Sequence, residues 1–432
     1  MSTVSNILSP ATRETVYRRN FIYFLTDSIL FSVAIAIISS TTVIPDFVRR
    51  LTDSEILIGL SGSLFTIGYT LPQLFIARYI VRHARKKWWF VGPNIPVRLV
   101  ILIFAGILIW LGRDQPGLVL LAFFICYGLA ALGDGVVGVP WADLTGTSLD
   151  QRWRARMLGL TTAITGITML LLAPLIGVVL SESGPGFPDN YAILFGFSGA
   201  LFVLSILPGL FIHELPGGAA VDKVPSLGEF LPQLGGMLRD DLPFRAFILT
   251  RVFSNLFMMA APFYIGYATV QLGEESAVAV PVLLAMETIG SISGALIYTW
   301  FGARHNLTFL RVALGLGVLL PVCALLAGVV GPIPLYLGFL IAGMATTTNL
   351  FFSLLNWIVG YADSDRRPIY VGLSNTVAAV VSLIAPFIAG TIAQNFGYPP
   401  LFVVAMLMAL CALFISVRYM RDSGPKPVSE AA

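Results

Sequence analysis

Long apolar runs recur from one end of this sequence to the other. Each run holds about 20 residues, which is the length that a helix needs to cross about 30 Å of hydrocarbon. Hydrophobic residues make up 57% of the chain and charged residues 11%, whereas about 25% of an average soluble protein is charged. The sequence therefore predicts an all-α polytopic membrane protein with twelve spans. They lie at residues 21–45, 56–80, 89–111, 117–141, 158–180, 190–212, 246–271, 277–301, 308–330, 333–360, 369–393 and 398–419.

The basic residues lie mainly in alternate segments between the spans. With the amino terminus inside, 20 of the 26 lysines and arginines fall in cytoplasmic segments. This is the positive-inside bias that fixes orientation. We therefore expect both termini to be cytoplasmic and the membrane to be the plasma (inner) membrane. The first apolar run is too long for a cleaved signal peptide, so we expect it to remain as the first span.

Two stretches far apart in the chain carry similar landmarks. Trp141 and Trp357 are 216 residues apart, and Gly159 and Gly372 are 213 apart. The pair Ala173-Pro174 recurs 212 residues later as Ala385-Pro386. Three similar offsets indicate one duplicated half. We expect an amino-terminal six-helix bundle at 1–212, a cytoplasmic linker at 213–245, and a carboxy-terminal six-helix bundle with a short cytoplasmic tail at 246–432.

The linker permits two interpretations. Ser226 and Glu229 have capping-box spacing, which can satisfy free amides at the start of a helix. Apolar residues then follow at helical intervals, so a short helix could lie along the inner membrane surface. Pro232 would kink or end that helix, and a plain tether fits the stretch equally well.

Motifs of soluble enzymes do not indicate an enzymatic function for this chain. Gly133 to Gly138 matches the dinucleotide fingerprint as a string, but it lies near the end of an apolar span, without the strand before it and the opening helix after it that the motif needs. Close helix packing explains these glycines better, and we interpret Gly290 and Gly294 in the same way. No Walker loop, metal-ligand cluster or nucleic-acid module is visible in the sequence. We expect no cofactor, no metal and no enzymatic activity; Cys126, Cys323 and Cys411 are interpreted as buried apolar residues.

Twelve spans in two related halves, a large middle loop and a basic loop after the second span resemble the major facilitator superfamily. The family's loop between spans 2 and 3 usually carries glycine, an acid and several basic residues. Gly68 to Lys87 supplies the glycine and the basic residues, but Ala77 stands at the acid's position, and Gly294 to Arg304 also lacks the acid. The resemblance covers nearly the whole chain. It implies two pseudo-symmetric six-helix bundles around a central cavity that spans 1, 4, 7 and 10 line.

Polar residues on those four spans are the candidate cavity lining. Span 1 and span 10 each carry hydroxyl or amide side chains at helical spacing on one face, and spans 4 and 7 add tyrosines. Any one of these residues could instead join helix to helix. The candidates are Ser28, Ser32, Ser39, Tyr127, Tyr264, Tyr267, Thr346, Asn349, Ser353 and Asn356. Such neutral groups favour an uncharged or amphiphilic solute.

Ionisable residues within spans are costly, so each is a functional candidate. Arg98 and Asp134 lie about 14 and about 10 Å from the cytoplasmic ends of their spans, at 1.5 Å per residue. An unpaired arginine at that depth would be expensive, which predicts an ion pair between them. Glu287 is a candidate proton carrier near the middle of span 8; it could equally be hydrogen-bonded and inert, or face a hydrated cleft.

Three classes of function follow. The first is a secondary active transporter that moves a small neutral or amphiphilic solute across the lipid bilayer by alternating access. Its coupling ion would be a proton or a sodium ion, and we expect no nucleic-acid partner. The second is a membrane assembly or pigment-handling protein that keeps the fold without transport, since fold does not fix function. The third, an intramembrane enzyme, lacks a nucleophile–base pair or metal cluster at one depth. The sequence favours the first.

The first spans of the two halves generate a testable prediction. Asp27 and Arg251 lie at nearly corresponding places in the repeat, roughly 8–9 Å deep at 1.5 Å per residue. We hypothesise that they approach when the inner mouth is shut and separate when it opens. The alternative is that Arg251 snorkels to the membrane interface and Asp27 is hydrated within its own half. Cysteines at both positions are expected to cross-link in an outward-facing protein and far less in an inward-facing one. Cross-linking that is insensitive to state would contradict the hypothesis.

Overall fold

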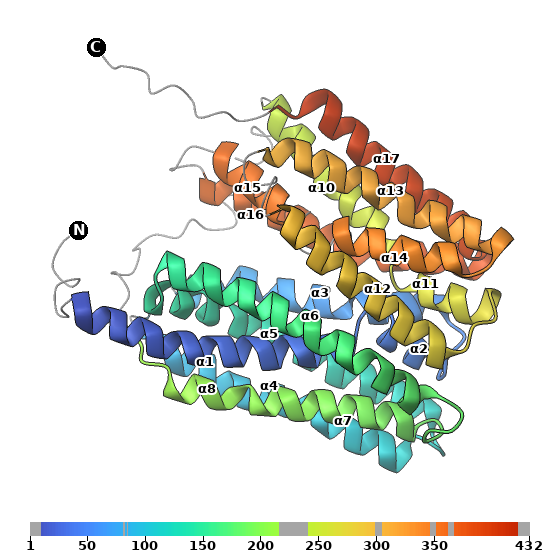
Figure 1. Ribbon diagram of the computed structural model, residues 1–432, viewed down its shortest axis with the longest axis horizontal. Helices are drawn as coiled ribbons and strands as arrows, with labels where there is room; N and C mark the ends of the chain where they lie inside the picture. The colour runs from blue at the N-terminus through green and yellow to red at the C-terminus, as the bar shows by residue number, and fades with distance from the viewer. Residues whose placement is uncertain are drawn as a thin grey trace. The chain divides into compact units, whose positions relative to one another are not determined.

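The structure is a computed structural model of the chain. It describes residues 10–80, 83, 85–215, 241–298, 305–345, 351–361 and 367–421. Within these ranges the chain consists of helices and short connecting segments, and no strand occurs there (Figure 1). Ten of the described helical segments are long and apolar enough to cross a membrane. The predicted all-α polytopic fold is confirmed.

The first six predicted spans each coincide with one helix or with two consecutive helices. In chain order these are α1 (Pro10–Ile37), α2 (Val43–Arg49), α3 (Glu55–Ile80), α4 (Lys87–Leu111), α5 (Pro116–Ser148), α6 (Gln151–Leu180), α7 (Asp189–Leu204) and α8 (Ile206–Phe211). The first span is divided between α1 and α2 by a turn at residues 38–42. The sixth is divided between α7 and α8 at Ser205.

The last six spans follow in the same way. They are α10 (Leu242–Phe257), the 3₁₀ turn η1 (Met258–Ala260), α11 (Phe263–Gly266), the π turn η2 (Tyr267–Gln271), α12 (Ser276–Ile297), α13 (Asn306–Val330), α14 (Ile333–Ala345), α15 (Phe351–Tyr361), α16 (Arg367–Phe396) and α17 (Tyr398–Tyr419). The seventh span, predicted as one helix over 246–271, is interrupted at Ala261 and Pro262, because proline has no N–H to continue the ladder of backbone hydrogen bonds. The tenth span corresponds to α14 and α15, and residues 346–350 between them lie outside the described ranges.

The chain forms two compact units. Unit 1 comprises Met1–Asp53, Ser61–Val224 and Ser276–Pro281, and unit 2 comprises Ser54–Leu60, Pro225–Glu275 and Val282–Ala432. In unit 1, α1 packs against α6, α7 and α8, and α4 packs against α5 and α7. In unit 2, α10 packs against α16 and α17, and α13 packs against α14 and α17. Residues 216–240, which include most of the expected linker and its capping-box residues, are outside the described ranges.

Each unit includes the first turn of one helix from the other half of the sequence. In unit 1, a Cβ atom on Gly177 of α6 would lie 2.9 Å from the carbonyl oxygen of Ala277, at the start of α12. In unit 2, a Cβ atom on Gly390 of α16 would lie 2.5 Å from the Cα of Ile56, at the start of α3. The two glycines follow Ala173-Pro174 and Ala385-Pro386, so both of these similar stretches make a close contact with the start of another helix.

The segment Pro140–Gly159, which includes the expected connection between the spans 117–141 and 158–180, is almost entirely helical. Helix α5 continues to Ser148 and α6 begins at Gln151, so only Leu149 and Asp150 separate them. The Asp150 carboxylate accepts a hydrogen bond from the Trp153 backbone N–H at 2.8 Å, which caps the start of α6. Both helices are therefore longer than the predicted spans 117–141 and 158–180.

Glycines allow one pair of helices in each unit to cross closely. A Cβ atom on Gly135 of α5 would lie 2.4 Å from the carbonyl oxygen of Tyr69 on α3. In unit 2, a Cβ atom on Gly290 of α12 would lie 2.0 Å from the carbonyl oxygen of Leu340 on α14, and one on Gly343 would lie 2.2 Å from that of Glu287. These contacts confirm that the glycines of spans 4 and 8 serve close helix packing, as small residues do in membrane bundles.

Replacing Gly135 with alanine is expected to destabilise the protein. The new methyl group would overlap backbone atoms of α3, and overpacking of this kind costs about 1–3 kcal/mol. Gly106 on α4 is the matched control, because a Cβ atom there would have nothing within 4 Å. Gly106→Ala should leave stability unchanged or raise it by up to about 1 kcal/mol. Thermal unfolding of the purified variants in detergent measures both, and equal midpoints would contradict the close crossing.

Candidate functional site

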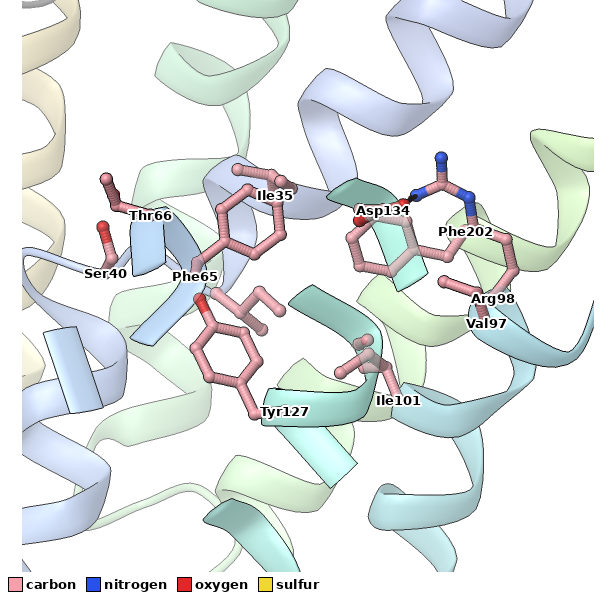
Figure 2. A pocket seen from close by; sticks show the side chains of 12 residues that line it. Ile35, Ser40, Phe65, Thr66, Val97, Arg98, Ile101, Tyr127, Asp134 and Phe202 are labelled. Carbon is pink, nitrogen blue, oxygen red and sulfur yellow. Dashed lines mark hydrogen bonds and ion pairs between the residues drawn. The ribbon is translucent and has the colours of Figure 1, made fainter. Parts of the chain in front are cut away.

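Two cavities in unit 1 share the side chains of Arg98 and Asp134. The larger has a volume of about 220 Å³ and is lined by Asp27, Ser28, Phe31, Ser32, Tyr69, Phe90, Arg98, Asp134, Val137, Gly138, Trp141, Leu158 and Thr161, which come from α1, α3, α4, α5 and α6. The smaller, of about 50 Å³, extends toward Ser40, Phe65, Thr66 and Tyr127. Figure 2 shows the smaller cavity, with Tyr127 and Ser40 on one side and Arg98 and Asp134 on the other. The region combines charge, aromatic rings and hydroxyl groups.

An ion pair lies at the centre of this region. Arg98 Nη1 is 3.1 Å from Asp134 Oδ1, and the two side chains are only 6% and 5% exposed. The Arg98 guanidinium also lies over two aromatic rings, 4.3 Å from the centroid of Phe31 and 5.1 Å from that of Phe202. Aromatic faces attract cations, and burial makes a counter-charge necessary. Helices α1, α4, α5 and α7 therefore meet at one arginine.

Asp27 lines the larger cavity and is less completely bonded. Its side chain is 3% exposed, and its Oδ2 accepts a hydrogen bond from Trp141 Nε1 at 3.1 Å. Its Oδ1 is buried and has no hydrogen-bond partner among the described residues. Burial of a carboxylate oxygen without a partner carries a large desolvation cost. Such a cost at one point of a cavity indicates a place where a ligand would complete the bonding.

Further polar atoms around the larger cavity are buried and have no hydrogen-bond partner among the described residues. They are Ser28 Oγ, Thr161 Oγ1 and Arg98 Nε, and both side-chain amide atoms of Asn94 on α4 are in the same state. Nearly all buried polar groups in native proteins have a partner. A concentration of unpartnered atoms in one part of unit 1 therefore supports a binding site for a polar group.

The predicted lining residues fall into three groups. Ser28 and Ser32 line the larger cavity and Tyr127 lines the smaller. Ser39 lies in the turn between α1 and α2, where its hydroxyl is 2.8 Å from that of Thr41, and it lines neither cavity. The remaining candidates belong to unit 2 or lie outside the described residues.

In unit 2, Tyr264 and Tyr267 are buried and pack against Phe402, with ring centroids 4.6 and 5.1 Å away. Ser353 is buried, and its carbonyl oxygen accepts a hydrogen bond from Asn306 at 2.8 Å. Asn356 is exposed and donates a hydrogen bond to the hydroxyl of Tyr298. Thr346 and Asn349 lie outside the described residues. These packing contacts give the two tyrosines a role in the core of unit 2.

Arg251 has hydrogen-bond partners within unit 2, and Glu287 lies at a close helix crossing there. Arg251 donates hydrogen bonds to the Ser374 hydroxyl and, at 2.9 Å, to Asn375 Oδ1. Glu287 is half-buried on α12, and its backbone carbonyl lies at the close crossing with Gly343. Its proposed role as a proton carrier stays a prediction.

Several site residues were missed by the sequence analysis. Phe31 and Phe202 hold the Arg98 guanidinium, but phenylalanine is common in any membrane span and gives no distinct signal. Thr161 and Asn94 lie on spans 5 and 3, which the family resemblance does not place at the cavity. Trp141 was identified only as a landmark of the repeat. Its bond to Asp27, 114 residues away, depends on how α1 and α5 pack.

The described residues contain no group of three or more histidine, cysteine, aspartate or glutamate side chains that could hold a metal ion. The side chains that line the larger cavity combine aromatic and aliphatic groups with a few polar ones. Hydrophobic and aromatic walls with a few well-placed polar groups are typical of small-molecule sites.

Helices long enough to span a membrane, with charged residues buried between them, define a polytopic membrane protein. The profile of the Major Facilitator Superfamily matches residues 20–381, which is most of the chain, and the protein therefore belongs to that superfamily. No curated protein sequence matches the chain.

Solved transporter structures share the fold at low sequence identity. A mutant of the nucleoside transporter NupG is 13% identical, with a TM-score of 0.69 over 92% of this chain and 98% of the other. A D-xylose-proton symporter is also 13% identical, with a TM-score of 0.67 over 95% and 99%. A bacterial homologue of the iron transporter ferroportin, in an inward-facing state, is 16% identical, with a TM-score of 0.62 over 93% and 98%.

The central ion pair predicts strong energetic coupling between its members. Arg98→Ala or Asp134→Ala alone leaves a buried charge without its partner, which costs about 3–5 kcal/mol. The double variant should be much less destabilised than the sum, with a coupling of about 0.5–3 kcal/mol. The exposed pair of Arg113 and Asp189 is the control, and its coupling should not exceed about 1 kcal/mol. Thermal unfolding of the single and double variants of both pairs measures the two coupling energies, and additive effects at Arg98 and Asp134 would contradict the prediction.

Proposed function

We propose that this protein is a secondary active transporter that moves a small neutral or amphiphilic solute by alternating access. The observation that carries the proposal is the larger cavity of unit 1. It combines the buried charges of Asp27, Arg98 and Asp134 with unpartnered polar atoms and aromatic walls. Charged residues inside membrane segments mark substrate or ion pathways. A solute that enters this cavity would satisfy the unpartnered atoms, and binding would thereby bias one conformation of the transporter.

The Arg98–Asp134 pair has a positioning role in this proposal. Phe31 and Phe202 fix the guanidinium, so the charges around the solute are held before it binds. Prior fixation lowers the entropic cost of binding. The side chains of Ser28, Ser32 and Tyr127 would then contact the solute through their hydroxyl groups, while the rings of the cavity contact its apolar part.

The coupling ion in the proposal is a proton or sodium. A proton is favoured by one similar structure, which is a D-xylose-proton symporter. That protein and the nucleoside transporter carry organic solutes, and the cavity volume of about 220 Å³ suits an organic solute here. We further propose a plasma-membrane location with both termini cytoplasmic, on the basis of the positive-inside distribution of arginine and lysine. Transport in this form involves no catalysed chemical reaction.

Solute flux into proteoliposomes tests the proposal. The purified protein is expected to move at least one labelled solute from a panel of nucleosides, pentoses and amphiphilic amines, and an imposed proton or sodium gradient should accelerate that flux. Arg98→Ala is expected to lower the rate at least about 10-fold, which corresponds to about 1.4 kcal/mol, because the cavity loses its fixed cation. Arg113→Ala is the control, since Arg113 is exposed and lines neither cavity.

Two results would contradict the proposal. Equal flux in the Arg98→Ala and Arg113→Ala variants would show that transport does not depend on this cavity. Saturable binding of a solute with no flux under any gradient would favour the non-transporting membrane assembly or pigment-handling protein on the same fold. A thermal-shift screen with the same panel identifies the solutes for both measurements.

A further inference from the structure

The larger cavity of unit 1 contains more negative than positive charge. Its lining includes two carboxylates, Asp27 and Asp134, and one guanidinium, Arg98. We propose that this cavity binds the protonated amino group of an amphiphilic solute, with Asp27 as its counter-ion. The inference rests on the proposed transport function and names the chemical class of the solute.

The charge of Arg98 is already matched by Asp134. The two side chains are 3.1 Å apart and almost fully buried, and the guanidinium lies over the rings of Phe31 and Phe202. These contacts hold Arg98 on one side of the cavity and assign its counter-charge. The carboxylate of Asp27 is therefore the charge left over.

The bonding of Asp27 is suited to an ammonium group. Its Oδ2 has a neutral donor in the indole of Trp141, and its Oδ1 has no partner. Ser28 Oγ and Thr161 Oγ1 line the same cavity and are also buried without partners. A primary ammonium has three donors and no acceptor. One carboxylate oxygen and two hydroxyl oxygens could accept all three.

The rest of the wall is apolar and aromatic. Tyr69, Phe90 and Trp141 contribute rings, and Val137 and Leu158 contribute aliphatic surface. Aromatic faces attract cations, and they do so more strongly when water is excluded. A cavity of about 150 Å³ can hold benzene, so about 220 Å³ accommodates a ring with a short chain. A bare metal ion would leave most of this space unfilled, and a sugar would leave many hydroxyls against apolar wall.

Binding of phenylbutylamine and its neutral isostere phenylbutanol to the wild-type protein in detergent tests the proposal without any mutation. Isothermal titration at neutral pH, where the amine is protonated, is expected to give a Kd at least about 30-fold lower for the amine. Equal affinities would overturn the proposal. Heat from sodium chloride that Asp27→Asn abolishes, together with no detectable binding of the amine, would also overturn it, since Asp27 would then hold a metal cation.

Two matched substitutions locate the interaction. Asp27→Asn removes the charge and is expected to weaken amine binding about 30-fold while leaving the affinity for phenylbutanol unchanged. Asp46→Asn is the control, because Asp46 is equally buried at 3% exposed but lies outside both cavities, bonded to Tyr191 and Ser276. It should bind the amine as the wild type does. A folded Asp27→Asn protein that keeps its amine affinity would overturn the proposal.

If Asp27→Asn fails to fold, Asp27→Glu is the variant that keeps the carboxylate, and the comparison of amine with alcohol in the wild type still tests the proposal.

The binding result is also independent of transport. Flux of neutral solutes with no preference for amines would support the transport function and contradict the amine-binding proposal. Selective amine binding through Asp27 without flux of any solute would support the amine site and contradict the transport function.

Discussion

Every backbone amide of a chain that crosses a bilayer must find its hydrogen-bond partner inside the protein. This constraint produces the helices of both units, and it also fixes where they can break. The break between α1 and α2 occurs at residues 38–42, where the hydroxyls of Ser39 and Thr41 bond to each other. The break in the seventh span occurs at Ala261 and Pro262. Both breaks lie in the first span of a half, and broken helices of transporters often form binding sites.

The same constraint explains why glycine and charge occur together in this fold. The carbonyl of Tyr69 on α3 approaches α5 closely because Gly135 has no side chain. Its neighbour Asp134 is thereby placed in the interior of unit 1, where its side chain is only 5% exposed. Arg98 supplies the missing counter-charge. Close packing and buried charge are thus two results of one crossing, since a bulkier residue at Gly135 would separate the helices and admit lipid or water to the ion pair.

The sequence predicted the spans well because length and hydropathy alone determine whether a helix can cross a membrane. It predicted the ends of α5 and α6 poorly, since charged residues such as Asp143 and Arg152 are equally stable in a helix that extends into water. At the site, Asp27, Arg98 and Asp134 could be identified from the cost of burying charge. Phe202, Thr161 and the bond from Trp141 to Asp27 could not, because nothing local distinguishes them. Only the packing of α1 against α5, α6 and α7 assigns them to the site.

The two halves have kept their packing residues but not their polar residues. Gly177 and Gly390 make equivalent close contacts, as expected if duplication preserved the helix crossings. The tryptophans of the repeat differ: Trp141 donates to the carboxylate of Asp27, whereas Trp357 donates to the backbone carbonyl of Arg421. Arg251, near the position that corresponds to Asp27, bonds to Ser374 and Asn375. Packing contacts constrain both halves alike, whereas a binding site needs its charges only once. The polar contact of Trp141 with Asp27 belongs to the candidate site of unit 1, whereas the contacts of Trp357 and Arg251 lie within unit 2.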